Sequence, residues 1–133
     1  MPIVVDASVV LAPILKEARP RALAGLDRAE WVVPALWWFE VRNGLVVNER
    51  RNRVTEIETT GFLQRLSNTD LTIDSSPDEG ALMALCRKHR LTVYDAAYLE
   101  LALREQLPLA TLDTALAAAA RREGVAVPGD DAP

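Results

Sequence analysis

Short apolar segments alternate along this chain with longer segments that favour helix, and this alternation restricts the possible folds more than any other feature. Strands are expected at 1–6, 31–33, 71–73, 109–112 and 125–127, with a short extended piece at 91–93. Helices are expected at 8–17, 20–28, 34–50, 77–89, 95–106 and 114–122, with one more beginning at residue 55. Short strands between helices of about ten residues predict a single α/β domain. Its sheet should be mostly parallel, with about four to five strands and helices on both faces.

Local signals place several of these boundaries. Thr55 followed by Glu58 has the spacing of a capping box, which marks the start of a helix. Pro13 lies inside the first expected helix and should kink or shorten it, because proline lacks the backbone N–H that a helix interior uses. We expect residues 1–127 to form the domain and residues 128–133 to form a disordered acidic tail.

The composition excludes several classes of protein. The single cysteine, Cys86, has no partner for an internal disulfide or a zinc site. No apolar stretch approaches the roughly 18 to 20 residues that cross a bilayer. Asp6 interrupts the first apolar stretch, so we expect no secretory signal, no membrane contact and a cytoplasmic protein. The formal net charge of −4 argues against nucleic-acid binding through bulk positive charge.

Acidic side chains follow three of the expected extended segments. Asp6 ends the first strand, Asp95 follows the extended piece at 91–93, and Asp113 follows the strand at 109–112. Parallel strands bring such positions to one edge of the sheet, where ligands bind in open α/β folds. Each aspartate could instead be only a helix N-cap. Glu40 differs, since it lies within an apolar helix segment where a carboxylate is costly without a partner.

A shared site for these acids predicts a particular chemistry. Carboxylates a few ångströms apart repel one another and raise one another's pKa, and a divalent cation offsets that repulsion. Oxygen ligands suit Mg²⁺ or Mn²⁺, which keep several waters and also bind phosphate oxygens. Phosphodiester hydrolysis is the reaction class that such a site best supports.

Four segments of the chain resemble the PIN-domain nucleases and, within them, the VapC toxins of bacterial toxin–antitoxin pairs. The order and spacing of these segments match over roughly residues 2 to 127. They are VVDAS at 4–8, Pro34 with EVRN at 40–43, TVYDAAY at 92–98, and LATLD at 109–113. The resemblance implies that the following are the catalytic, metal-binding acids: Asp6, Glu40, Asp95 and Asp113. It implies that the following are supporting polar groups: Ser8, Asn43 and Thr111.

The resemblance also implies an activity and partners. It suggests a Mg²⁺- or Mn²⁺-dependent endoribonuclease acting on single-stranded or structured RNA, held inactive by a cognate VapB-type antitoxin and forming a homodimer. A housekeeping PIN nuclease and a catalytically inactive PIN-fold interaction module remain the alternatives. A haloacid dehalogenase-type phosphatase is disfavoured, because Ser8 stands where that mechanism needs a second aspartate. A receiver domain is disfavoured too, because Val4 and Val5 replace its acidic pair.

Basic and aromatic residues supply candidates for RNA contacts. Phosphate contacts could come from Arg42 or from the basic residues at 50–53 and 87–90, although a solvated helix end is the simpler role for each. Trp37, Trp38 and Tyr98 are candidates for stacking on unpaired bases, but core packing or a dimer face is the favoured role for each. We assign no catalytic role to His89.

Overall fold

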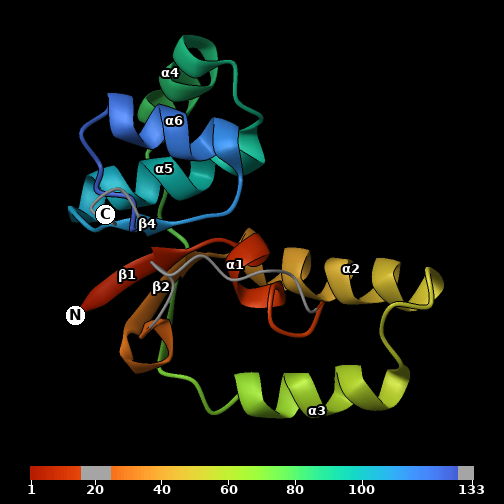
Figure 1. The fold of residues 1–133 in the computed structure, drawn as a ribbon. Coiled ribbons are helices and arrows are strands. Elements are labelled where there is room, and N and C mark those ends of the chain that lie inside the picture. The colour runs from red at the N-terminus through yellow and green to blue at the C-terminus, as the bar shows by residue number, and fades with distance from the viewer. Residues whose placement is uncertain (16–24, 129–133) are drawn as a thin grey trace, which may run out of the picture.

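Parallel strands form the centre of the computed structural model, which describes residues 1–15 and 25–128 of the 133-residue chain. The strands are β1 (Pro2–Val5), β2 (Glu30–Pro34), β3 (Leu71–Asp74) and β4 (Leu109–Ala110), in the order β3-β2-β1-β4. Every neighbouring pair is parallel. The predicted α/β class and mostly parallel sheet are therefore confirmed (Figure 1).

The helices lie in two groups on opposite sides of this sheet (Figure 1). One group consists of α4 (Glu79–His89), α5 (Val93–Glu105) and α6 (Thr114–Arg122), and α5 contacts β1, β2 and β4. The other consists of α1 (Ala7–Leu11), α2 (Leu36–Arg50) and α3 (Glu56–Leu66), with α2 and α3 running in opposite directions. Among the described residues, no helix is long and apolar enough to cross a membrane.

The core forms where both groups meet the sheet. The central strands contribute valines because a strand covered on both faces has no polar face to expose. Tyr98 of α5 and Trp37 of α2 are almost completely buried against them. The other large side chains with the least exposure are Val4, Val5, Val33, Val41, Leu45, Leu99, Leu101, Leu109 and Leu116.

Helices α1 and α2 approach each other closely at one glycine. A Cβ atom built on Gly44 would lie 2.4 Å from the Cδ1 atom of Leu11, so any larger residue would force Leu11 to move. This contact holds α1, which begins directly after Asp6, against the helix that carries Glu40. The missing side chain at Gly44 therefore helps to set the position of two acids.

Several predicted boundaries are wrong, for local reasons. The extended piece at 91–93 is not a strand, since Val93 is already the first residue of α5. The predicted strand at 125–127 is not formed, although the backbone N–H of Leu109 donates to the carbonyl of Ala126 at 2.9 Å. The predicted strand at 109–112 ends at Ala110.

The start of the chain also differs from expectation. The first helix ends at Leu11 as a regular α-helix, two residues before Pro13. The helix expected at 20–28 falls mainly outside the described residues, and its described part is a 3₁₀ turn, η2 (Leu26–Arg28). Most of the tail expected at 128–133 also lies outside the described residues. The capping box at Thr55 and Glu58 is confirmed, with both reciprocal hydrogen bonds present.

Candidate active site

Asp6 lies at the carboxyl end of β1 and caps the N-terminus of α1. Its side chain accepts hydrogen bonds from the Ser8 hydroxyl at 2.5 Å, from the backbone N–H of Val9 at 3.2 Å, and from the Thr111 hydroxyl. The residue is only 6% exposed. Burial raises the pKa of Asp6, and the hydrogen bonds only partly oppose that rise. A carboxylate held this way has a fixed orientation but an unfavourable charge.

The hydroxyl partners of Asp6 come from α1 and from the segment that follows β4. Thr111 follows Ala110 directly, so its hydroxyl reaches the carboxyl edge of β1. The Ser8 hydroxyl, which donates to Asp6, accepts a hydrogen bond from the backbone N–H of Leu112 at 3.1 Å. Ser8 and Thr111 therefore orient Asp6 from two sides and tie β1 to the segment after β4.

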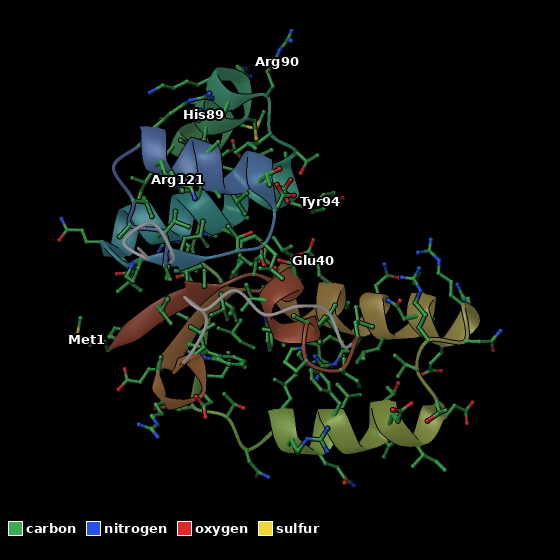
Figure 2. All side chains as sticks on the ribbon, in the orientation of Figure 1. Met1, Glu40, His89, Arg90, Tyr94 and Arg121 are labelled. Atoms are coloured by element: carbon green, nitrogen blue, oxygen red, sulfur yellow. The ribbon has the colours of Figure 1, made fainter. Side chains whose placement is uncertain are left out.

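Glu40 reaches the same region from helix α2. One of its carboxylate oxygens accepts a hydrogen bond from the Tyr98 hydroxyl of α5 at 2.5 Å. The pKa of Glu40 is raised, first by burial and then by the negative charges of Asp95 and Asp6, while the Tyr98 hydrogen bond lowers it. Glu40 thus lies between the two helix groups (Figure 2).

Asp95 joins the site from α5, by a different route from the one expected. It does not follow a strand but lies in the first turn of the helix, where its backbone N–H donates to the N-cap hydroxyl of Thr92 at 3.1 Å. Burial raises the pKa of Asp95, and repulsion from Asp113 and Asp6 raises it further. A first-turn acid also benefits from the helix dipole.

Asp113 is the most exposed of the four acids. It caps α6 by accepting a hydrogen bond from the backbone N–H of Leu116 at 2.9 Å, and its own N–H donates to the Thr111 hydroxyl at 3.0 Å. The N-cap alternative therefore describes Asp113 and Asp6 correctly. It does not exclude a second role, because the charges of both raise the pKa of Asp95.

The four acids form an electrostatic cluster without a cationic partner. Within 1–15 and 25–128, no lysine, arginine or histidine forms an ion pair with any of them. The same part of the chain holds no group of three His, Cys, Asp or Glu side chains close enough to ligate one ion directly. The set of oxygen donors suits a hard cation that keeps its waters, because such an ion binds through few direct ligands. A fully dehydrated site would need side-chain movement.

A groove of about 410 Å³ adjoins Glu40. It is lined by Leu36, Phe39, Glu40, Asn43 and Tyr94. Asn43, the third supporting residue suggested by sequence, is exposed here and belongs to this groove, whereas Ser8 and Thr111 contact Asp6.

Of the three candidates for base stacking, Trp37 and Tyr98 take the favoured role of core packing. Trp37 is 1% and Tyr98 2% exposed, so neither can stack on a base. Trp38 is partly exposed and carries the guanidinium of Arg42 above its ring, 3.9 Å from the ring centroid. The freely exposed aromatic side chains are Phe39 and Tyr94, which the sequence reasoning missed. Each directly precedes a candidate acid, and that adjacency is the signal that could have found them.

Comparisons with known proteins point to one family. The family model that describes the PIN domain matches residues 3–122. Ribonuclease VapC3 of Pyrobaculum aerophilum is 34% identical over 122 residues, which cover 88% of this chain and 93% of that protein.

Two solved structures share the fold at lower identity. The crystal structure of PAE2754 from Pyrobaculum aerophilum aligns with a TM-score of 0.74 and 22% identity, covering 96% of this chain and 89% of that one. A toxin–antitoxin complex from Klebsiella pneumoniae contains a chain that aligns with a TM-score of 0.55 and 21% identity, covering 84% of this chain and 87% of that one.

Proposed function

The chain belongs to the PIN-domain family, and from this premise we propose that it is a divalent-metal-dependent endoribonuclease that acts as the toxin of a toxin–antitoxin pair. The observation that carries the proposal is the gathering of Asp6, Glu40 and Asp95 within reach of one another's charge. Burial raises the pKa of all three, and repulsion from neighbouring carboxylates raises the pKa of Glu40 and Asp95 further. Such an arrangement costs folding free energy, and strained groups of this kind are commonly found at binding and catalytic sites.

Each residue has a defined part in this proposal. Asp6, Glu40 and Asp95 would hold a Mg²⁺ or Mn²⁺ ion, and Asp113 would hold a second ion or orient the attacking water. When bound, the cation makes water a stronger nucleophile and stabilises charge on the phosphate oxygens. The hydroxyls of Ser8 and Thr111 hold Asp6 in one orientation. Tyr98 favours the ionised form of Glu40 by donating a hydrogen bond to it.

The substrate and partners follow from the same premise. RNA is supported by the ribonuclease named VapC3, to which this chain is 34% identical. A cognate antitoxin is supported by the toxin–antitoxin complex that shares the fold. We further propose that the protein acts in the cytoplasm as a homodimer. The net charge of −4 does not prevent RNA binding, because a cation held by the acids would make the local charge that the phosphate meets positive.

The direct test is cleavage of total RNA by the purified protein in Mg²⁺, Mn²⁺ or EDTA, with sequencing of the new 5′ ends. Wild-type protein should cut RNA only with the ion, and Asp6→Asn should not cut. Asp70→Asn is the matched control, because Asp70 is exposed and lies outside the site. Equal cleavage by Asp6→Asn would reject the assignment of the site.

Calorimetry separates this proposal from a catalytically inactive module. Wild-type protein should bind Mn²⁺, and a variant with all four acids changed to amides should not. An absence of both Mn²⁺ binding and RNA cleavage would favour an interaction module. Cleavage without co-purification of the product of the neighbouring gene would favour a housekeeping nuclease over a toxin.

A further inference from the structure

The groove beside Glu40 has an unusual lining for a surface next to an acidic site. The aromatic rings of Phe39 and Tyr94 are 69% and 63% exposed. Of the described residues that line it, Glu40 is the only charged one. Exposing two aromatic rings to water is unfavourable, and exposed aromatic patches commonly mark binding sites.

The two rings are positioned by the same elements that carry the acids. Phe39 directly precedes Glu40 on α2, and Tyr94 directly precedes Asp95 on α5. The Phe39 ring meets the Trp38 ring edge to face, at 5.0 Å between centroids. Figure 2 shows Tyr94 projecting outward from the start of α5, while Glu40 lies between the helix groups. A ligand in the groove therefore lies immediately next to the acids.

Asn43 adds a neutral polar group to a surface that is apolar apart from Glu40 and the Tyr94 hydroxyl. It lies one helical turn after Phe39 and Glu40, and its exposed amide has no hydrogen-bond partner among the described residues. An amide offers a donor and an acceptor side by side, which matches the edges of nucleobases. A neutral aromatic surface with one such amide is complementary to a flat, polar-edged and uncharged group.

We propose that this groove binds one unpaired base of the RNA, next to the phosphate that is cleaved. The proposal rests on the function proposed above and adds a determinant of sequence preference to it. The base would stack on Phe39 or Tyr94, and Asn43 would contact its edge. Its phosphate is covalently attached and would lie at the acids, where a cation offsets the charge of Glu40. Neutral rings accept every base, so selection among bases falls to Asn43.

The first test measures cleavage positions and kinetics with single-stranded RNA. Phe39→Ala and Tyr94→Ala should lower kcat/KM at least about tenfold. Asn43→Ala should broaden the preference with a smaller loss of rate, and Tyr94→Phe should restore what Tyr94→Ala loses. The matched control is Ile57→Ala, which removes an 85% exposed apolar side chain from α3 and should change neither quantity.

The second test observes stacking without cleavage. A short RNA carrying the fluorescent base 2-aminopurine at the preferred position is mixed with Asp6→Asn protein. Stacking should quench the fluorescence. A double variant that carries Phe39→Ala or Tyr94→Ala together with Asp6→Asn should show no quenching. Because both aromatic residues are mostly exposed, their removal should leave the fold intact, which circular dichroism checks.

The outcomes distinguish this proposal from the one it rests on. Unchanged cleavage positions and kcat/KM in both alanine variants would overturn it. So would variants that cut RNA normally but no longer bind a partner protein, since the groove would then be a protein-binding surface. If wild-type protein cuts no RNA, the nuclease proposal fails, and quenching alone decides whether the groove binds a base.

Discussion

The hydroxyl of Tyr98 donates a hydrogen bond to Glu40 at 2.5 Å, although the two residues are 58 positions apart in the chain. Burial and the neighbouring carboxylate raise the pKa of Tyr98, so the phenol keeps its proton and remains a donor at neutral pH. The hydrogen bond stabilises the charged form of Glu40. A buried tyrosine of α5 thereby controls the ionisation of an acid on α2.

Tyr98→Phe should move the acidic limb of the activity profile to higher pH. Without the hydrogen bond, the pKa of Glu40 rises further, so more of the protein is protonated at a given pH. A hydrogen bond to a charged group is worth about 1.5–3 kcal/mol, which corresponds to about one to two pKa units. The measurement is kcat/KM for RNA cleavage between pH 5 and 9, with Mn²⁺ saturating. A loss of equal size at every pH would show that Tyr98 only supports packing.

Stability without metal should fall as the pH rises from about 4. The unfolded chain releases the proton of Asp6 near its ordinary pKa of 3.8, whereas burial raises the pKa in the folded protein. The folded state therefore binds more protons across this interval, and stability decreases with pH until the folded pKa is passed. Glu40 and Asp95 act in the same direction. Melting temperatures of EDTA-treated protein at a series of pH values would reveal the slope.

Asp6→Asn should make the stability of the metal-free protein fall less steeply with rising pH. At neutral pH without metal, we expect its Tm to exceed that of the wild type by about 4 °C, the shift that roughly 1 kcal/mol causes in a domain of this size. The amide oxygen can still accept from Ser8 and from the backbone N–H of Val9, and the Thr111 hydroxyl can rotate to accept from the amide nitrogen, so the hydrogen bonds are kept. Adding Mn²⁺ should stabilise the wild type and leave the variant unchanged. A lower Tm for Asp6→Asn in EDTA would contradict this account.

Thr111→Val should weaken metal binding and cleavage about tenfold. The valine keeps the volume but removes one donor to Asp6 and the acceptor used by the backbone N–H of Asp113. Loss of a hydrogen bond of this kind costs about 1–3 kcal/mol. Thr111→Ser should restore both properties, because it keeps the hydroxyl. Calorimetry with Mn²⁺ and kcat/KM are the two readouts, and unchanged Mn²⁺ affinity in Thr111→Val would contradict a positioning role.

Arg104→Ala should destabilise the fold without belonging to the site. Arg104 donates to Asp74 at the end of β3 through two nitrogens, at 3.1 and 2.7 Å, and to Glu100 at 2.7 and 3.0 Å. The Glu100 side chain is 3% exposed, so removal of Arg104 leaves a buried charge unpaired. We expect the free energy of unfolding, measured by urea denaturation, to fall by about 2–3 kcal/mol. This is less than is usual for breaking a buried ion pair, because Arg104 is partly exposed.

The control for Arg104→Ala is Arg87→Ala, an exposed position near the end of α4 that should change stability by less than about 0.5 kcal/mol. Acid supplies a second check. Arg104 lowers the pKa of Asp74, so this stabilisation is present above the ordinary value of 3.8 and is lost as the pH falls through the lower folded pKa. Asp74→Asn should reduce this loss of stability at acidic pH, which is the acid limb of the stability profile. A wild-type limb that stays unchanged in Asp74→Asn would refute the contribution.

Local patterns in the sequence predicted the four strands that form, although they also predicted one at 125–127 that does not, and they placed two of the acids at helix N-caps. Val4 and Val5 belong to a short apolar run that forms a buried strand, and the strand ends just before Asp6. Asp6 and Asp113 cap the helices that follow β1 and β4. Asp95 was assigned to the correct neighbourhood through the wrong element. A short apolar run such as 91–93 can begin a helix as readily as it forms a strand, and only tertiary packing decides.

Residues whose role depends on distant partners could not be predicted. Nothing near Tyr98 in the sequence indicates that its hydroxyl reaches Glu40. Arg104 has a visible partner four residues earlier in Glu100, but Asp74 comes from another element. The neighbouring tryptophans 37 and 38 look equivalent, yet consecutive residues on a helix point about 100° apart, so one is buried and the other is partly exposed.

The bond between Asp6 and Thr111 also has a consequence for protein synthesis, because it joins residues 105 positions apart. A ribosome makes Asp6 long before Thr111, so a nascent chain cannot complete this pairing until β4 and the segment after it have emerged. Fragments from interrupted translation that stop before β4 would carry Asp6, Glu40 and Asp95 but lack Thr111, one of the two hydroxyl donors that orient Asp6. Asp6 therefore acquires its full set of hydrogen bonds only after the segment that follows β4 has been made.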